Sequence, residues 1–198
     1  MQNSKSIEKQ LIKTREAFIK IRQIEINFEK GDFSEIDFFI QYSGQYALDY
    51  ALEWTAFYGK IDLVKKVLDA GANIHSNNDA ALLMACENSH LDIVSYLLSM
   101  GADINANNAG PLFNAVSRNH IDVTKFLLEY KDTNGKNICN VNDNCAIALR
   151  IAIEYGYYDI CKLLIKHGAD IYVCDDLPLS LAKRKGYTNI VDLLEKNS

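Results

Sequence analysis

An internal repeat constrains this 198-residue chain more than any other feature. Similar segments follow one another at spacings of 30, 30, 37 and 30 residues. They begin at Tyr50, Ala80, Gly110, Ile147 and Leu177. The chain contains 2 prolines, Pro111 and Pro178, and both occupy the same position of the repeat. Five copies of one unit predict a stack of small units rather than a domain with a unique topology.

The pattern within each unit predicts two antiparallel helices. The first helix begins near the proline position, because a fixed φ and a missing N–H cost nothing in a first turn. The second helix opens with a residue that suits the helix dipole, at Asp62, Asp92, Asp122, Asp159 and Asn189. A glycine ends it at Gly71, Gly101 and Gly168. One such pair cannot bury its own apolar stripe, whereas a stack of pairs can.

The turn between the two helices is expected to adopt the left-handed backbone conformation, which glycine and asparagine tolerate best. The residues at this position are Gly59, Ser89, Asn119, Gly156 and Gly186. Ser89 is the poorest fit among them. Small and apolar residues recur along the first helix and should let neighbouring helices approach closely, with Trp54 expected in the core between units.

These recurring residues resemble the ankyrin repeat. Turns such as His-Leu-Asp-Ile-Val at 90–94 and tails such as Gly-Ala-Asp-Ile-Asn at 101–105 carry the resemblance, with a degenerate helix start at Gly110-Pro111-Leu112-Phe113. The resemblance covers residues 46–198 and implies an all-α solenoid of stacked helix–turn–helix units. The family's usual Thr and His are replaced at the helix start, so packing is expected to replace their hydrogen bonds. The usual ankyrin period is 33 residues, three more than the 30-residue period of this chain. The resemblance therefore implies shortened hairpin connectors with little β-strand.

The domain organisation follows from the same register. We expect an N-terminal helical cap over residues 1–45 and the ankyrin-repeat array over 46–198. The units of the array are predicted near 46–75, 76–105, 106–142, 143–172 and 173–198, the last being a C-terminal cap. An insertion at 131–137 accounts for the longer spacing and is predicted to form an exposed loop. In the cap, one helical face is predicted from Ile7, Leu11, Phe18, Ile21 and Phe28, followed by a decayed helix at 31–40.

Composition excludes several functional classes. With 21 basic against 26 acidic residues and a net charge of −5, the chain is not expected to bind nucleic acid. No apolar run approaches the roughly 18 residues of a membrane span, and the charged N-terminus does not resemble a secretory signal. The 5 cysteines include no Cys-x-x-Cys pair, which favours reduced thiols in the cytoplasm. Units of 30 residues with Asn-Asn connectors resemble ankyrin proteins of giant amoebal DNA viruses, which would place the protein in a host cytoplasm; intracellular bacteria are a second possible source.

No catalytic, cofactor or metal site is predicted, and the chain is not expected to be an enzyme. It lacks the glycine-rich phosphate and nucleophile motifs. His90 and His120 occupy a repeat position from which the ring can bond backbone groups. An alternative metal site at His167 with Cys161 or Asp170 lacks the spacing of ligands on one face. Asp175 and Asp176 are expected to be solvated loop residues. As a minor hypothesis, Asn105 resembles the ankyrin sites that asparaginyl hydroxylases modify.

A protein-binding scaffold with a concave groove, acting as a monomer, is the leading interpretation. In ankyrin proteins the variable contact positions are the two residues before the inter-helix turn, together with the connector tips. The corresponding residues here are Phe57, Tyr58, Glu87, Asn88, Ser117, Arg118, Glu154, Tyr155, Arg184 and Lys185. Phe57 and Tyr58 could alternatively pack under the cap, and the basic run 183–185 could be a solvated helix end. Two further functions stay open: an adaptor whose N-terminal helices dock a second protein, and a metalloprotein that uses the cysteine and histidine residues.

Overall fold

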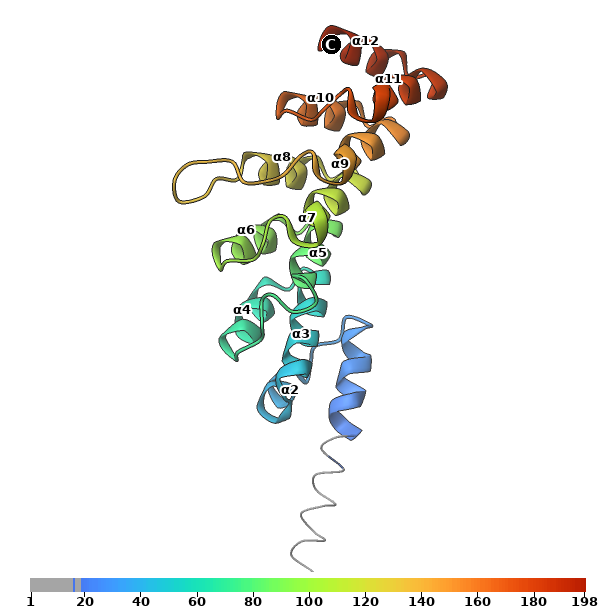
Figure 1. Ribbon diagram of the computed structural model, residues 1–198. Coiled ribbons are helices and arrows are strands. Elements are labelled where there is room, and N and C mark those ends of the chain that lie inside the picture. The colour runs from blue at the N-terminus through green and yellow to red at the C-terminus, as the bar shows by residue number, and fades with distance from the viewer. Residues whose placement is uncertain (1–15, 17–18) are drawn as a thin grey trace, which may run out of the picture.

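The computed structural model describes residue 16 and residues 19–198, apart from the side chains of 144–145 and 174–176. Ile7, Leu11 and Phe18, predicted for the face of the cap, lie outside these residues. Within the described part of the chain the regular structure is helical, and the only extended pairing is a single bridge between Lys131 and Asn137. The predicted all-α solenoid of stacked units is confirmed (Figure 1).

Two layers of short helices make up the stack. The inner layer contains the first helix of every unit: α3 (Gln45–Phe57), α5 (Ala80–Glu87), α7 (Ala106–Ser117), α9 (Asp143–Glu154) and α11 (Val173–Lys185). The outer layer contains the second helices: α4 (Ile61–Asp69), α6 (Leu91–Ser99), α8 (Ile121–Glu129), α10 (Tyr158–Lys166) and α12 (Thr188–Lys196). Neighbouring inner helices contact one another more extensively than neighbouring outer helices do. The unit-to-unit spacing is therefore set mainly by the inner layer.

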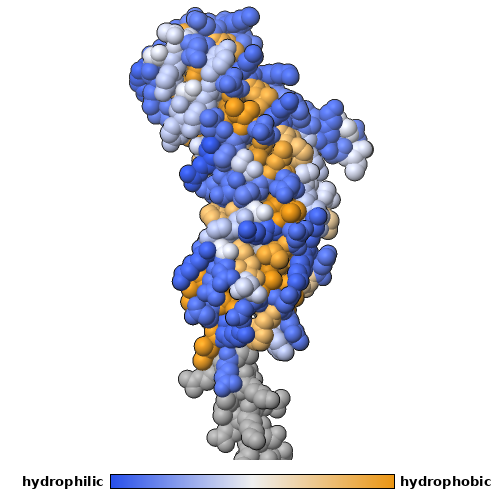
Figure 2. All heavy atoms as spheres, turned by 180° about the vertical axis from the view of Figure 1, so that it is seen from behind, coloured by the Kyte–Doolittle hydropathy of each residue, from blue (hydrophilic) through white to orange (hydrophobic). Residues whose placement is uncertain are grey.

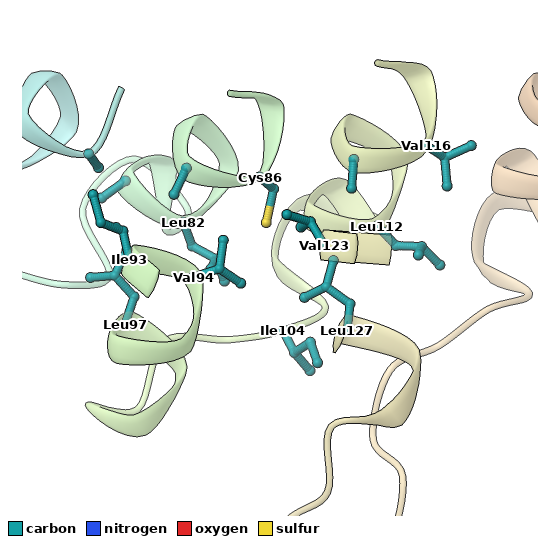
Figure 3. Close-up of a cluster of buried hydrophobic side chains, with 14 of the residues drawn as sticks. Leu82, Cys86, Ile93, Val94, Leu97, Ile104, Leu112, Val116, Val123 and Leu127 are labelled. Atoms are coloured by element: carbon teal, nitrogen blue, oxygen red, sulfur yellow. The ribbon is translucent and has the colours of Figure 1, made fainter. Parts of the chain in front are cut away.

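The core is one continuous cluster of apolar side chains that runs between the layers. The second and third units contribute corresponding residues, such as Leu82 with Leu112 and Leu97 with Leu127, as the close-up of α5 to α8 in Figure 3 shows. Ala85, Ala115 and Ala152, each two residues before the end of its inner helix, are completely buried. Small side chains at this position let the helices approach closely, as the recurring pattern predicts. Trp54, by contrast, is only partly buried and packs against the edge of the core.

The turns between paired helices have the predicted left-handed conformation in every unit. The φ angles are +68° at Gly59, +63° at Ser89, +60° at Asn119, +73° at Gly156 and +75° at Gly186. The glycines that end the outer helices also have positive φ, with +101° at Gly71, +100° at Gly101 and +87° at Gly168. Local turn chemistry therefore defines where each helix of the hairpin begins and ends.

The connectors between units contain left-handed turns in place of hairpin strands. Asn77, Asn78 and Asp79 have φ of 48°, 56° and 58°, and the corresponding residues 107–109 have 54°, 57° and 59°. Helix α7 therefore contains a left-handed turn ahead of Gly110, and its regular part begins near the predicted proline position. This compact turn fills the space that three additional residues would otherwise span.

Side-chain acceptors close four of the units, a feature that the sequence analysis missed. At the start of a unit or on the residue just before it, a side-chain oxygen accepts a hydrogen bond from a backbone N–H in the tail of that unit. The N···O distances are 2.7 Å from Asn73 to Asp49, 2.9 Å from Asp103 to Asp79, 2.7 Å from Asn140 to Asn105 and 2.7 Å from Asp170 to Asn142. Packing alone was expected to replace the family's missing Thr and His. The structure shows that these hydrogen bonds contribute as well.

The N-terminal segment covers the first unit. Residues 19–28 are helical and α2 (Ile36–Tyr42) follows, beginning later than the helix predicted at 31–40. Phe28 and Phe39 are fully buried, with ring centroids 4.8 Å apart, and Phe33 stacks on Phe28 at 4.9 Å. Phe33 also meets the ring of Tyr58 in α3 edge to face at 5.9 Å. An aromatic cluster therefore joins this segment to the array.

Residues 131–137 form an exposed loop between α8 and α9, which projects beyond the outer helices in Figure 1. The Asp132 carboxylate accepts hydrogen bonds from the backbone N–H groups of Asn134 and Lys136, each at 2.9 Å. These bonds hold the pKa of Asp132 below its ordinary value. The bridge between Lys131 and Asn137 brings the two ends of the loop together.

Candidate functional site

Three shallow hollows lie along the inner helices and extend from the first unit to the last. The first, of about 430 Å³, is lined by Phe57, Glu87, Asn88, Arg118 and His120. The second, of about 220 Å³, is lined by Leu83, Asn107, Asn108, Gly110, Phe113, Asn114 and Ile147. The third, of about 200 Å³, is lined by Ile147, Arg150, Ile151, Glu154, Leu177, Leu181 and Arg184. We call the surface formed by these residues the inner-helix face.

Six of the ten residues predicted to bind a partner line these hollows. They are Phe57, Glu87, Asn88, Arg118, Glu154 and Arg184. The remaining members, Tyr58, Ser117, Tyr155 and Lys185, line none of the three. Figure 2 shows that apolar residues gather in a band along the length of the molecule, interrupted by polar ones.

Tyr58 is engaged by the N-terminal segment. Its hydroxyl donates a hydrogen bond of 2.7 Å to the Glu29 carbonyl oxygen, and its ring packs over the backbone of Gly31. Phe57 stands beside it, with its ring edge to face against Trp54 at 5.3 Å. The two aromatic residues of the predicted pair therefore have different surroundings, because only Phe57 faces a hollow.

The middle of the face is held by local hydrogen bonds. Arg118 donates to the Glu87 carboxylate at 2.5 Å, which links the second and third units. The Asn88 amide donates to the Met84 carbonyl oxygen at 2.9 Å and the Ser117 hydroxyl donates to the Asn114 carbonyl oxygen at 3.0 Å. Asn88 and Ser117 therefore satisfy carbonyl groups of their own helices.

The C-terminal end of the face is more open. Lys185 forms an ion pair with Glu154 across the fourth and fifth units. Tyr155 is 58% exposed and stacks on Tyr157 with a centroid distance of 5.6 Å. Arg184 is exposed in the last turn of α11, beside the hollow that it shares with Arg150.

The histidines of the turns bond the backbone of the preceding unit. His90 Nε2 lies 2.9 Å from the Phe57 carbonyl oxygen, and His120 Nε2 lies 2.8 Å from that of Glu87. The sequence analysis anticipated this role for both rings. The rings lie over the preceding turn, where a Cβ added to Gly59 would fall 2.6 Å from the His90 ring.

The described side chains include no group of three His, Cys, Asp or Glu residues that is arranged to hold a metal ion. Burial raises the pKa of the Cys86 thiol, and it raises the pKa of Cys139 and of Cys161 to about 12. A thiol with a raised pKa is a poor nucleophile at neutral pH. The side chains of Cys145, Cys174 and the Asp175-Asp176 pair are outside the described part of the chain.

The Asn105 amide bridges two positions after the loop. Its Nδ2 donates to the Ile138 carbonyl oxygen at 2.7 Å, and its Oδ1 accepts from Asn140. Asn105 thus connects the end of the second unit to the tail of the third. Its hydroxylation stays a prediction. Among the described residues, no helix combines the length and apolar character needed to cross a bilayer.

Sequence reasoning missed several residues that line the hollows. Leu83, Phe113 and Arg150 share one repeat position, and Ile147 and Ile151 lie on the same side of α9. A signal was available, because Leu83, Phe113 and Arg150 precede Glu87, Ser117 and Glu154 by four residues. Side chains four residues apart lie on the same side of a helix.

A family model described as ankyrin repeats (3 copies) matches residues 28–108, 50–137 and 105–175. Taken together, these overlapping ranges extend from residue 28 to residue 175 and cover more than half of the chain. A search of curated proteins found no match.

Proposed function

Because the chain belongs to the ankyrin-repeat family, whose members generally mediate protein interactions and are typically non-catalytic, we propose that it is a non-catalytic scaffold. In this proposal the inner-helix face is a concave groove that binds one protein partner. The observation that carries the proposal is the series of hollows, which extends over all units and combines apolar, aromatic and charged side chains. Surfaces of this composition favour protein recognition.

The partly or fully exposed anchors of the proposed groove differ from unit to unit. Phe57 lies at the N-terminal end, Phe113 near the middle, and Ile151 and Arg184 toward the C-terminal end. Aromatic and arginine side chains are enriched among residues that dominate binding energy. A shared helical frame with variable anchors can select one partner among many.

Capture of proteins from a cell extract on the immobilised chain tests the proposal. A variant with Phe57→Ala, Phe113→Ala and Arg184→Ala should lose the captured partner, as measured by quantitative mass spectrometry. A matched outer-layer variant, Tyr96→Ala with Leu91→Ala and Lys162→Ala, should keep it. Circular dichroism of both variants checks that the helices persist. Equal capture by the two variants would contradict binding at the inner-helix face.

A second candidate, the two-part adaptor, is favoured by apolar side chains on the N-terminal segment. Ile19 is 59% exposed, Ile26 is 42% exposed and Tyr46, at the start of α3, is 76% exposed. In the adaptor these side chains would dock a second protein. The double variant Ile19→Glu and Ile26→Glu should then lose one captured protein and keep the partner of the inner-helix face. If the variant loses no captured protein, residues 1–45 serve only as a cap.

We also propose that the chain works as a monomer in a reducing cytoplasm, which is the host cytoplasm if the source is a giant amoebal DNA virus. The free thiols of Cys86, Cys139 and Cys161 support a reducing compartment. The 30-residue period and the Asn-Asn connectors support the viral origin. Light scattering should give the mass of one chain, 22.3 kDa. A dimer mass would contradict the monomer.

A further inference from the structure

The sign of the charge changes along the inner-helix face. In the first two units, the charged residue that lines the hollows of this face is Glu87. In the last three units, the charged residues that line the hollows are Arg118, Arg150, Glu154 and Arg184, whose charges sum to +2. The whole chain has a net charge of −5, so positive charge is concentrated here against the overall trend.

Ion pairs neutralise part of this charge and leave two arginines. Arg118 pairs with Glu87, and Lys185 pairs with Glu154. Neither Arg150 nor Arg184 has an ion-pair partner among the described side chains. Both line the third hollow, whose remaining walls are mainly aliphatic. Among the described side chains, the positive charge without an ion-pair partner on this face therefore lies at one apolar depression between α9 and α11.

The aliphatic walls determine what kind of anion fits this hollow. Ile147, Ile151, Leu177 and Leu181 surround it together with the two arginines and the paired Glu154. A guanidinium binds a carboxylate through two parallel hydrogen bonds, and an apolar depression binds a hydrocarbon side chain. A nucleic-acid backbone would offer phosphates without the hydrocarbon, and the acidic remainder of the protein would repel a long polyanion.

On these grounds, and resting on the proposed function, we infer that the third hollow binds an acidic segment of the partner protein. The segment places an aliphatic or aromatic side chain in the hollow, with a carboxylate on each side for Arg150 and Arg184. Its acidic end lies over the last two units.

Random dodecapeptides displayed on phage and selected on the full-length chain test this inference. Peptides that bind should be enriched in Asp and Glu around a Leu, Ile, Val or Phe. The variant Arg150→Glu with Arg184→Glu should lose about tenfold or more of its affinity for the selected peptides, as measured by fluorescence anisotropy. Lysine at both positions should restore part of the affinity, because charge remains while the paired hydrogen bonds are lost.

The matched control is Lys162→Glu with Lys166→Glu on α10 in the outer layer, which changes the net charge by the same amount. This control should keep its affinity for the peptides, and a thermal melt should show that both variants fold. If the selected peptides bind the inner-helix face but show no excess of acidic residues, the inference of an acidic segment is contradicted. The proposed scaffold function is not affected by that result. Equal weakening by both variants would also overturn the inference. The inference would also be overturned if the wild type binds an oligothymidylate and the Arg150→Glu, Arg184→Glu variant does not.

Discussion

At the scale of the residue, left-handed backbone positions determine much of this molecule. Every inter-helix turn requires one, and the connectors contain runs of them, including Asn77 to Asp79. For an L-amino acid other than glycine, each costs roughly 1–2 kcal/mol, with asparagine and aspartate the best tolerated. The Asn-Asn connectors are therefore a consequence of the shortened period, because this turn requires residues that tolerate positive φ.

Ser89 offers a direct test of this cost. Ser89→Gly should raise the free energy of unfolding by about 1 kcal/mol, because the serine has a φ of +63° and an exposed side chain. Ser95→Gly, inside α6, should instead lower it by about 0.5–1 kcal/mol. Urea titration followed by circular dichroism measures both values. A destabilised Ser89→Gly variant would contradict the strain at this turn.

Burial makes Glu53 a source of pH dependence. Its pKa is raised above 4.5, chiefly by burial and also by the nearby Asp49, while the hydrogen bond from Asn77 opposes the shift. The folded chain holds this proton to higher pH than the unfolded chain does, so this group's contribution to stability falls as pH rises from about 4.5 through the raised pKa.

Glu53→Gln removes this ionisation and keeps an oxygen for Asn77. The melting temperature of the Glu53→Gln variant should exceed that of the wild type at pH 7. The difference between the two proteins should shrink at pH 4, where Glu53 of the wild type is protonated. Differential scanning calorimetry at both pH values measures it, with the exposed Glu129→Gln on α8 as the matched control. A variant that is less stable at pH 7 would show that the ionised carboxylate is needed.

At the scale of the element, each helical hairpin is closed by its own side chains and coupled to its neighbours. The acceptors Asp49, Asp79, Asn105 and Asn142 bond the tails of four units. His90 and His120 bond the units that precede them. The insertion at 131–137 contributes little to either set, because its hydrogen bonds from Asp132 are internal to the loop.

Deletion of residues 131–137 should therefore leave the array intact. The deletion restores the 30-residue spacing and joins positions that the Lys131–Asn137 bridge already holds close. Shortening a flexible loop changes its closure entropy by only about 1 kcal/mol. Chemical denaturation should accordingly remain cooperative, with a free energy of unfolding within about 1 kcal/mol of the wild type. A loss of cooperativity would mean that the loop is needed to align α8 and α9.

At the scale of the whole molecule, the stack depends on its ends. Each unit contacts only its neighbours, so a terminal unit exposes one apolar side unless another segment covers it. At the N-terminus, Phe28, Phe33 and Phe39 cover the first unit through contacts that include Tyr58. At the C-terminus, α12 presents the polar residues Asp192, Glu195 and Lys196 to solvent.

Removal of residues 1–44 should therefore destabilise the first unit and promote aggregation. Burial of each phenylalanine contributes about 2 kcal/mol, so the loss amounts to several kcal/mol. Size-exclusion chromatography and thermal melting measure the effect. The full-length variant Phe28→Ala should be destabilised by about 3–5 kcal/mol and serves as a milder version. A truncated chain that stays monomeric with an unchanged melting temperature would contradict the capping role.

The fold could be read from the sequence because its determinants are local and repeated. The positions of Gly59, Ser89 and Asn119 define the turns, the apolar spacing defines two helices per unit, and five copies of the unit define a stack. These features depend on backbone conformation and on side chains within about one helical turn. The left-handed connectors were missed, since the three-residue deficit alone does not specify how the backbone turns.

The candidate site could be read only in part. Repeat register identified Phe57, Glu87, Arg118 and Arg184, which line hollows, but gave Tyr58 the same standing as Phe57. Only the tertiary structure showed that Tyr58 is hydrogen-bonded to Glu29, which lies 29 residues earlier in the chain. It also showed that Arg150 and Arg184 line the same hollow, whereas Arg118 forms an ion pair with Glu87. By itself the sequence determined the helices, the turns and the stack, because those follow from short-range chemistry. Which exposed side chains remain available was decided only by the folded stack, because contacts between distant residues cover some of them and leave others open.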